Sequence, residues 1–157
     1  MSRGNILAIA AAVLLTELPL SFHAIAQEDV IEKRKVIMRA NNDAVSKSIK
    51  KAVEEKDYIT IELKAKDIMA GMDAIVNLIP PGSTSEKSRA HPDIWTKTDD
   101  FKSHAVATRK VAEALSKAAA AKNEAEVNVK VKELGNNRDG SCGDCHKLYR
   151  TDFRKGS

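Results

Sequence analysis

Apolar residues recur at intervals of three and four along most of the chain, which is the spacing typical of amphipathic helices. Four such segments are predicted, at about residues 29–56, 58–79, 94 or 96–121, and from 123 into the C-terminal region. No convincing strand pattern is found. A polar linker at residues 82–91 is too long for a tight turn, so we expect it to cross the outside of the fold. The pattern predicts an all-α, antiparallel four-helix bundle.

Each segment carries one apolar stripe that is expected to face the bundle core. In the first segment the stripe is Ile31, Met38, Val45, Ile49 and Val53, and in the second it is Ile61, Ala65, Ile68, Met72, Ile75 and Ile79. In the third it is Phe101, Ala105, Thr108, Ala112, Leu115 and Ala119, and in the fourth it is Val127, Val131, Leu134, Cys142, Cys145 and Tyr149.

Local signals mark where the helices begin and end. Asp57 is a candidate N-cap of the second segment, and residues 80–82, Pro-Pro-Gly, are expected to stop it. Asn123, followed three residues later by a glutamate, resembles a capping box at the start of the fourth segment. Gly135 and Gly140 weaken this last helix, so a bend is predicted there.

The fourth segment contains Cys142-Gly143-Asp144-Cys145-His146, which has the C-x-x-C-H spacing of a c-type haem attachment site. In such a site the two thiols form thioethers with the haem vinyl groups, and the histidine is the proximal iron ligand. On a helix, positions three and four apart lie on one face, so all three side chains can face one flat macrocycle. The motif predicts one covalently bound haem c, held by Cys142, Cys145 and His146.

Other uses of the cysteine pair fit the sequence less well. A thioredoxin-like dithiol requires a βαβ context, for which the sequence shows no pattern. A zinc site requires four ligands, and only His91 and His104 remain beside the motif after the leader is removed. A simple disulfide between Cys142 and Cys145 would leave the adjacent histidine unexplained.

The first residues have the composition of a secretory signal peptide. Arg3 provides a positive charge, residues 6–20 are mostly apolar, and Ala24-Ile25-Ala26 is an A-x-A cleavage site. An uncleaved anchor is disfavoured because a glutamate and a proline break the apolar run. We therefore expect residues 1–26 to be a signal peptide, cleaved after Ala26, and residues 27–157 to form one periplasmic domain without a membrane span.

The formal net charge is +4, and the basic residues are dispersed among acidic ones without interleaved aromatic residues. This arrangement argues against nucleic-acid binding. A mildly basic exported protein is suited to transient docking on an acidic patch of a redox partner. Lys147, Arg150, Arg154 and Lys155 form a candidate docking patch, although such runs are commonly just solvated.

Three sequence motifs resemble the class II cytochromes c, which comprise cytochrome c prime and its low-spin, Met-ligated relatives of the cytochrome c-556 type. Arg34-Lys35-Val36-Ile37-Met38 resembles the first-helix segment of that family. Pro92-Asp93-Ile94-Trp95, followed by Phe101, resembles its Pro-acid-Ile-Trp segment before the third helix. The C-x-x-C-H motif lies in the last helix and is followed by Tyr149-Arg150, as in the family. The resemblance covers essentially the whole mature chain and implies a four-helix bundle with haem on the C-terminal helix.

The resemblance also implies roles for two residues of the first helix. Met38 lies at the distal haem position, so its thioether is the expected second axial ligand, with core packing as the alternative. Arg34 is a candidate contact of a haem propionate, with a solvated helix face as the alternative. Met69, Met72 and His104 are rival donors, for which core packing or a position at the bundle margin is the preferred interpretation.

Three functions follow from these observations. The leading hypothesis is a periplasmic electron carrier with His146/Met38 ligation and no enzymatic activity, either monomeric or homodimeric. The second is a five-coordinate cytochrome c prime that binds NO or CO. The third is an exported helical bundle without haem, in which the cysteine pair is oxidised.

Overall fold

The computed structural model describes residues 19–136 and 141–152, with side chains from residue 27 onward, and this part of the chain is mostly helical. Two residues, Ala90 and Arg150, form an isolated antiparallel bridge. The helices are α1 (Pro19–Asp43), α2 (Lys50–Glu54), α3 (Tyr58–Ile75), α4 (Asp93–Thr96), α5 (Thr98–Ala120), α6 (Glu124–Gly135) and α7 (Cys142–Tyr149). A π-helical turn, Ala44–Ile49, joins α1 to α2.

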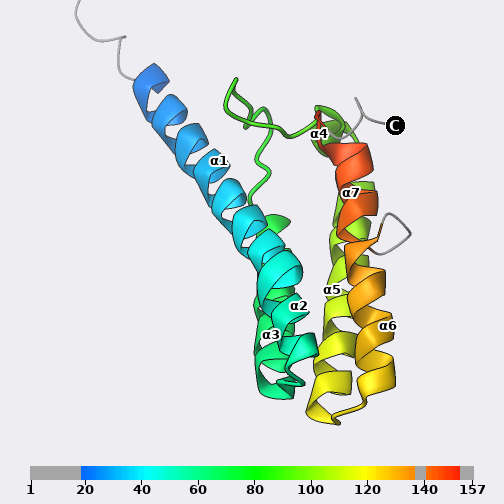
Figure 1. The fold of residues 1–157 in the computed structure, drawn as a ribbon. Coiled ribbons are helices and arrows are strands. Elements are labelled where there is room, and N and C mark those ends of the chain that lie inside the picture. Colours follow the sequence, from blue (N-terminus) through cyan, green and yellow to red (C-terminus); the bar gives the residue numbers. More distant parts are fainter. Residues whose placement is uncertain (1–18, 137–140, 153–157) are drawn as a thin grey trace, which may run out of the picture.

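The helices form the predicted antiparallel bundle (Figure 1). One half consists of α1, continued by the π-helical turn and α2, with α3 running back beside it. The other half consists of α5, with α6 and then α7 following each other along it. The two halves meet mainly where α3 packs against α5. The expectation of an all-α four-helix bundle is therefore confirmed.

The core lies where the predicted apolar stripes meet. Every stripe residue of the second and third predicted segments is buried, including Ile61, Ile68 and Leu115, which have no exposed surface. Each large aliphatic side chain buried in this way contributes about 1.5–3 kcal/mol relative to an exposed one. In the first and fourth segments only part of the stripe is fully buried, and Met38, Cys142 and Cys145 are partly buried against the core.

The first predicted helix is present but is longer and less regular than expected. It is already helical at Pro19, the first described residue, rather than from near residue 29, and the π-helical turn interrupts it. It ends at Glu54, and Lys56 then takes a left-handed conformation with φ of 56°. Asp57 is the N-cap of α3, as predicted, because its carboxylate accepts hydrogen bonds from the backbone N–H and the hydroxyl of Thr60.

Two predicted helix boundaries were wrong. The second segment ends at Ile75, four residues before Ile79, because tight turns follow and the residue preceding Pro80 is disfavoured in a helix. The third segment is two helices, α4 and α5, which are separated by Lys97 with φ of −121° and ψ of 46°. The Thr98 hydroxyl donates to the carbonyls that end α4, so it helps to close this break.

The fourth predicted segment is divided, as expected. Asn123 caps α6 by accepting a hydrogen bond of 3.1 Å from the backbone N–H of Glu126. The helix ends at Gly135, and α7 begins at Cys142 after the N-cap Ser141. Gly140, the other glycine on which the prediction depended, lies outside the described residues. The division leaves the haem motif on a short helix of its own.

Residues 76–92, here called the crossover segment, connect α3 to α4 across the top of the bundle in Figure 1. Its polar residues are not all solvated, because Ser83 is completely buried. Within residues 19–136 and 141–152, no helix combines the length and apolar character that are needed to span a membrane. The expected cleavage point after Ala26 falls inside α1 and stays a prediction.

Candidate haem-binding site

The three motif side chains lie together on α7, which begins at Cys142. The helix is capped by Ser141, whose buried hydroxyl accepts a 3.1 Å hydrogen bond from the backbone N–H of Asp144. At its other end the backbone N–H of Arg150 donates to the carbonyl of His146. Because Cys142, Cys145 and His146 are spaced three and four apart, they project to one side of this helix.

Burial keeps the three donor groups uncharged. Burial raises the pKa of the Cys142 thiol. Burial raises the pKa of the Cys145 thiol to about 12, with further contributions from the negative potential of Cys142, Asp144 and Asp100. Burial, with the positive charge of Arg150, lowers the pKa of His146 below its ordinary value. A neutral imidazole is the form that coordinates iron.

This donor set fits a covalent haem better than the alternatives. Both cysteines are free thiols, so the two sulfurs are available for thioether bonds. No cluster of three or more His, Cys, Asp or Glu side chains that could hold a metal ion occurs in the described part of the chain, which argues against the zinc interpretation there. The cysteines pack against the apolar core, an environment that suits a large flat apolar group.

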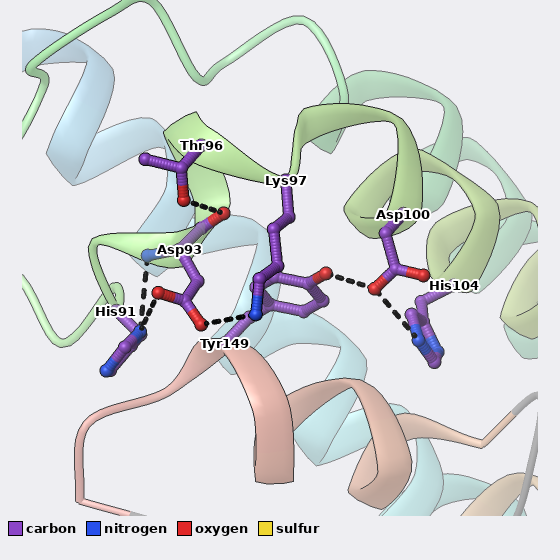
Figure 2. A network of polar contacts seen from close by, with 7 residues as sticks. All are labelled: His91, Asp93, Thr96, Lys97, Asp100, His104 and Tyr149. Atoms are coloured by element: carbon purple, nitrogen blue, oxygen red, sulfur yellow. Dashed lines mark hydrogen bonds and ion pairs between the residues drawn. The ribbon is translucent and has the colours of Figure 1, made fainter.

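A polar network connects α7 to α5 (Figure 2). The phenol of Tyr149 donates a short hydrogen bond to Asp100, and the Tyr149 ring meets Phe101 edge to face, with centroids 5.4 Å apart. His104 lies between two carboxylates: Nε2 is 3.6 Å from Asp100 and Nδ1 is 3.1 Å from Asp144. Asp144 belongs to the haem motif, so α5 holds the attachment helix by a direct side-chain contact.

His91 is partly buried at the end of the crossover segment. Its Nδ1 accepts a 3.2 Å hydrogen bond from the backbone N–H of Asp93 and lies 3.4 Å from the Asp93 carboxylate. That carboxylate also pairs with Lys97 at 3.2 Å (Figure 2). The linker folds back on α4 at this point, which explains why His91 is only partly exposed.

The end of the crossover segment pairs with the end of α7. The backbone N–H of His91 donates to the carbonyl of Tyr149, and that of Thr151 donates to the carbonyl of Arg89. The Asp152 carboxylate joins these two segments because it accepts hydrogen bonds from both Arg150 and Arg89. The two arginines lower the pKa of this carboxyl to about 2. The haem-bearing helix is therefore attached to the crossover segment through its backbone.

The structure describes two of the four residues of the predicted docking patch. Lys147 is exposed, whereas Arg150 is half-buried and paired with Asp152. Arg154 and Lys155 lie outside the described residues. The patch stays a hypothesis.

The methionines differ in their surroundings. Met72 is buried within the α3 stripe, which confirms core packing. Met38 on α1 and Met69 on α3 are each partly buried against the same core. Iron ligation by Met38 therefore remains a prediction, with Met69 as the natural comparison.

Arg34 is buried, with 7% of its surface exposed, so the alternative of a solvated helix face was wrong. One terminal nitrogen donates to the carbonyl of Leu78 at 3.0 Å and the hydroxyl of Ser83 at 2.8 Å, and the other donates to the carbonyl of Ser83. Burial lowers the pKa of the guanidinium. Contact with a haem propionate stays a prediction, and both terminal nitrogens already have partners in the crossover segment.

Sequence reasoning missed two of these residues. Asp144 is one of the variable positions of the motif and gave no signal of a partner 40 residues earlier in the chain. Ser83 is one of several small polar residues in the linker, and no local pattern distinguishes it from its neighbours. Both act through contacts between distant parts of the sequence, which periodicity cannot reveal.

Comparison with known proteins agrees with this geometry. A family model described as "Cytochrome C'" matches residues 29–150. A cytochrome c' from Pararhodospirillum photometricum is 30% identical over 126 residues, covering 78% of this chain and 97% of that protein. A cytochrome c-556 from Agrobacterium tumefaciens is also 30% identical, over 122 residues, covering 76% and 95%.

A solved structure shows the same fold. Cytochrome c prime from Shewanella frigidimarina superposes with a TM-score of 0.69 at 22% identity, covering 80% of this chain and 97% of that one. The fold, the donor set on α7 and the family match agree with one another. The chain therefore belongs to the cytochrome c' family and is a c-type cytochrome with one covalently attached haem c.

Proposed function

We propose that the protein is a periplasmic electron carrier in which His146 and Met38 are the two axial ligands of the haem iron. The haem supplies the one-electron chemistry, and His/Met ligation raises its reduction potential. The observation that carries the proposal is the position of Met38, a thioether on α1 that is partly buried against the same core as Cys142 and Cys145. One relative of the chain is named cytochrome c-556, which is one of the two types in the family that the sequence motifs resemble.

The residues of the chain have separate tasks in this proposal. Cys142 and Cys145 fix the haem to α7, and His146 remains a neutral ligand because it is buried. Ser141, His104 and Tyr149 hold α7 in place, so the proximal side is rigid. A rigid ligand set that is the same in both oxidation states limits reorganisation during electron transfer.

The alternative function is a five-coordinate haem that binds NO or CO on the distal side. It is favoured by one relative, which is named cytochrome c'. In that case Met38 is only a packing residue of α1. The two functions differ in a single bond, between iron and the Met38 sulfur.

The test is Met38→Ala in the haem-loaded protein, with Met69→Ala as a matched control from the same core. Met38→Ala is expected to convert the haem to high spin, lower its potential and create affinity for CO. Met69→Ala should leave all three unchanged. An unchanged low-spin spectrum in Met38→Ala would rule out this ligand, and a high-spin wild type that binds CO would favour the alternative.

The setting of this function is also a proposal. We expect export to the periplasm with cleavage after Ala26, no enzymatic activity, and exchange of electrons with a partner protein that has an acidic docking patch. The protein is either a monomer or a homodimer. Lys147 is the described residue of the candidate docking patch that is most exposed, so charge reversal there should slow electron exchange at low ionic strength.

A further inference from the structure

The crossover segment is held to α1 at one point by a single buried cation. The guanidinium of Arg34 donates to two carbonyls and one hydroxyl, those of Leu78 and Ser83. Ser83 has no exposed surface, so the two bonds to this residue are formed away from water, whereas the bond to Leu78 is part-buried. Hydrogen bonds from a charged donor are stronger than those between neutral groups. Arg34 is therefore the strongest attachment of this segment to α1.

Trp95 extends the attachment to α4. The Arg34 guanidinium lies over the Trp95 ring, 5.9 Å from its centroid, and the indole N–H donates to the carbonyl of Pro80 at 2.9 Å. Other links between α1 and the crossover segment, such as the Lys87–Glu28 pair, are exposed and contribute little. The buried contacts thus converge on Arg34.

The other end of the crossover segment is held to the haem-bearing helix. Residues 89–91 form backbone hydrogen bonds with Tyr149 and Thr151, and Ala90 bridges Arg150. One segment of chain therefore connects α1 to α7 across the top of the bundle (Figure 1). Since α1 carries Met38 one turn after Arg34, this connection links the helix that carries Met38 to the attachment helix.

We propose that Arg34 is a positioning residue, which fixes the crossover segment to α1 and thereby sets the position of Met38 relative to the haem attached to α7. Its partners are the carbonyls and hydroxyl of the protein itself. The consequence for the haem rests on the proposed function, whereas the attachment of the crossover segment does not.

The experiment compares Arg34→Met with Arg39→Met in the haem-loaded protein. Methionine retains most of the length of the side chain but has no donors. Arg39 is on the same helix, has 64% of its side chain exposed, and lies 4.0 Å from Glu32. The first readout is amide hydrogen exchange of peptides from residues 76–92, and the second is the spin state and potential of the haem.

We expect Arg34→Met to accelerate exchange in residues 76–92 by about tenfold or more, and to weaken the low-spin spectrum. Arg39→Met should do neither. Ser83→Ala should cause a smaller change in the same direction, and it should add nothing in the double variant, because both substitutions break one attachment. If Arg34→Met does not fold, Ser83→Ala alone tests the proposal, by the same measurement of exchange in residues 76–92.

Unchanged exchange in residues 76–92 would overturn the proposal. An altered haem spectrum with unchanged exchange would do the same and would assign Arg34 to a haem propionate. Additive effects of Arg34→Met and Ser83→Ala on the exchange rate would also contradict the proposal. A wild-type haem without Met38 ligation would instead refute the proposed function, and the exchange result would still stand.

Discussion

His104 on α5 places its Nδ1 atom 3.1 Å from the Oδ2 atom of Asp144, which lies between the two cysteines of the haem motif. Oδ2 is buried and has no hydrogen-bond partner among the described residues, so its contact with His104 is an ion pair, charged when the imidazole is protonated, and not a hydrogen bond. His104 therefore places a side chain that can carry positive charge beside a carboxylate that the attachment helix buries.

Removing His104 should destabilise the haem-loaded protein. His104→Phe retains a ring next to Tyr149, whose centroid is 5.9 Å away, but removes both nitrogens. A buried group left without its partner costs about 1–3 kcal/mol, so the free energy of unfolding should fall by about that amount in denaturant titrations. In the double variant His104→Phe/Asp144→Ala the loss should be smaller than the sum of the single losses. Strict additivity would show that the two side chains do not interact.

Gly71 marks a close approach of α3 to side chains of α1. A Cβ atom at this position would lie 2.9 Å from Oδ1 of Asn41 and 3.2 Å from a methyl carbon of Ile37. Both neighbours are on α1, and Asn41 is buried, so neither can move freely. Gly71→Ala should therefore cost about 1–3 kcal/mol of stability and displace α1, which is measured by thermal unfolding and by the haem spectrum.

Gly135 provides the matched control for this substitution. Among the described residues, its added Cβ would meet a carbon of Val45, at an ordinary distance of 3.9 Å. Gly135→Ala should be neutral or slightly stabilising, since alanine favours a helix more than glycine does. Equal melting temperatures for the two variants would contradict the close packing of α1 on α3.

Tyr149 should make the protein sensitive to alkali. Burial first, and then the hydrogen bond to Asp100 and its negative charge, raise the pKa of the phenol above its ordinary value of 10.0. The folded state thus favours the neutral phenol. This contribution to stability is complete below about pH 10 and is lost as the pH rises toward the folded pKa.

The measurement compares wild type, Tyr149→Phe and Tyr58→Phe in denaturant at about pH 8 and about pH 11. Wild type and Tyr58→Phe should lose more free energy of unfolding between the two conditions than Tyr149→Phe does. If all three lose the same amount, the phenol of Tyr149 is not the group responsible.

Local features of this fold could be predicted from the sequence, whereas contacts across it could not. The caps Asp57 and Asn123 were predicted correctly because a cap depends on residues three positions away. The stripe of α3 was correct because burial follows helical periodicity. The break at Lys97 was missed, since neither proline nor glycine marks it.

The same distinction holds at the haem-binding site. Cys142, Cys145 and His146 could be recognised because the haem imposes a fixed spacing on adjacent residues. The partners of Arg34 and Tyr149 could not be, because Ser83 and Asp100 are each 49 residues away in the sequence. Arg34 was selected for its position relative to Met38, but its partners in the crossover segment only became visible in three dimensions.

The bond between iron and the Met38 sulfur is tested most directly by the absorption spectrum of the ferric, haem-loaded wild-type protein. The account predicts a low-spin spectrum with the sulfur-to-iron charge-transfer band, and the loss of that band in Met38→Ala but not in Met69→Ala. A high-spin ferric spectrum without the band in the wild type would contradict it.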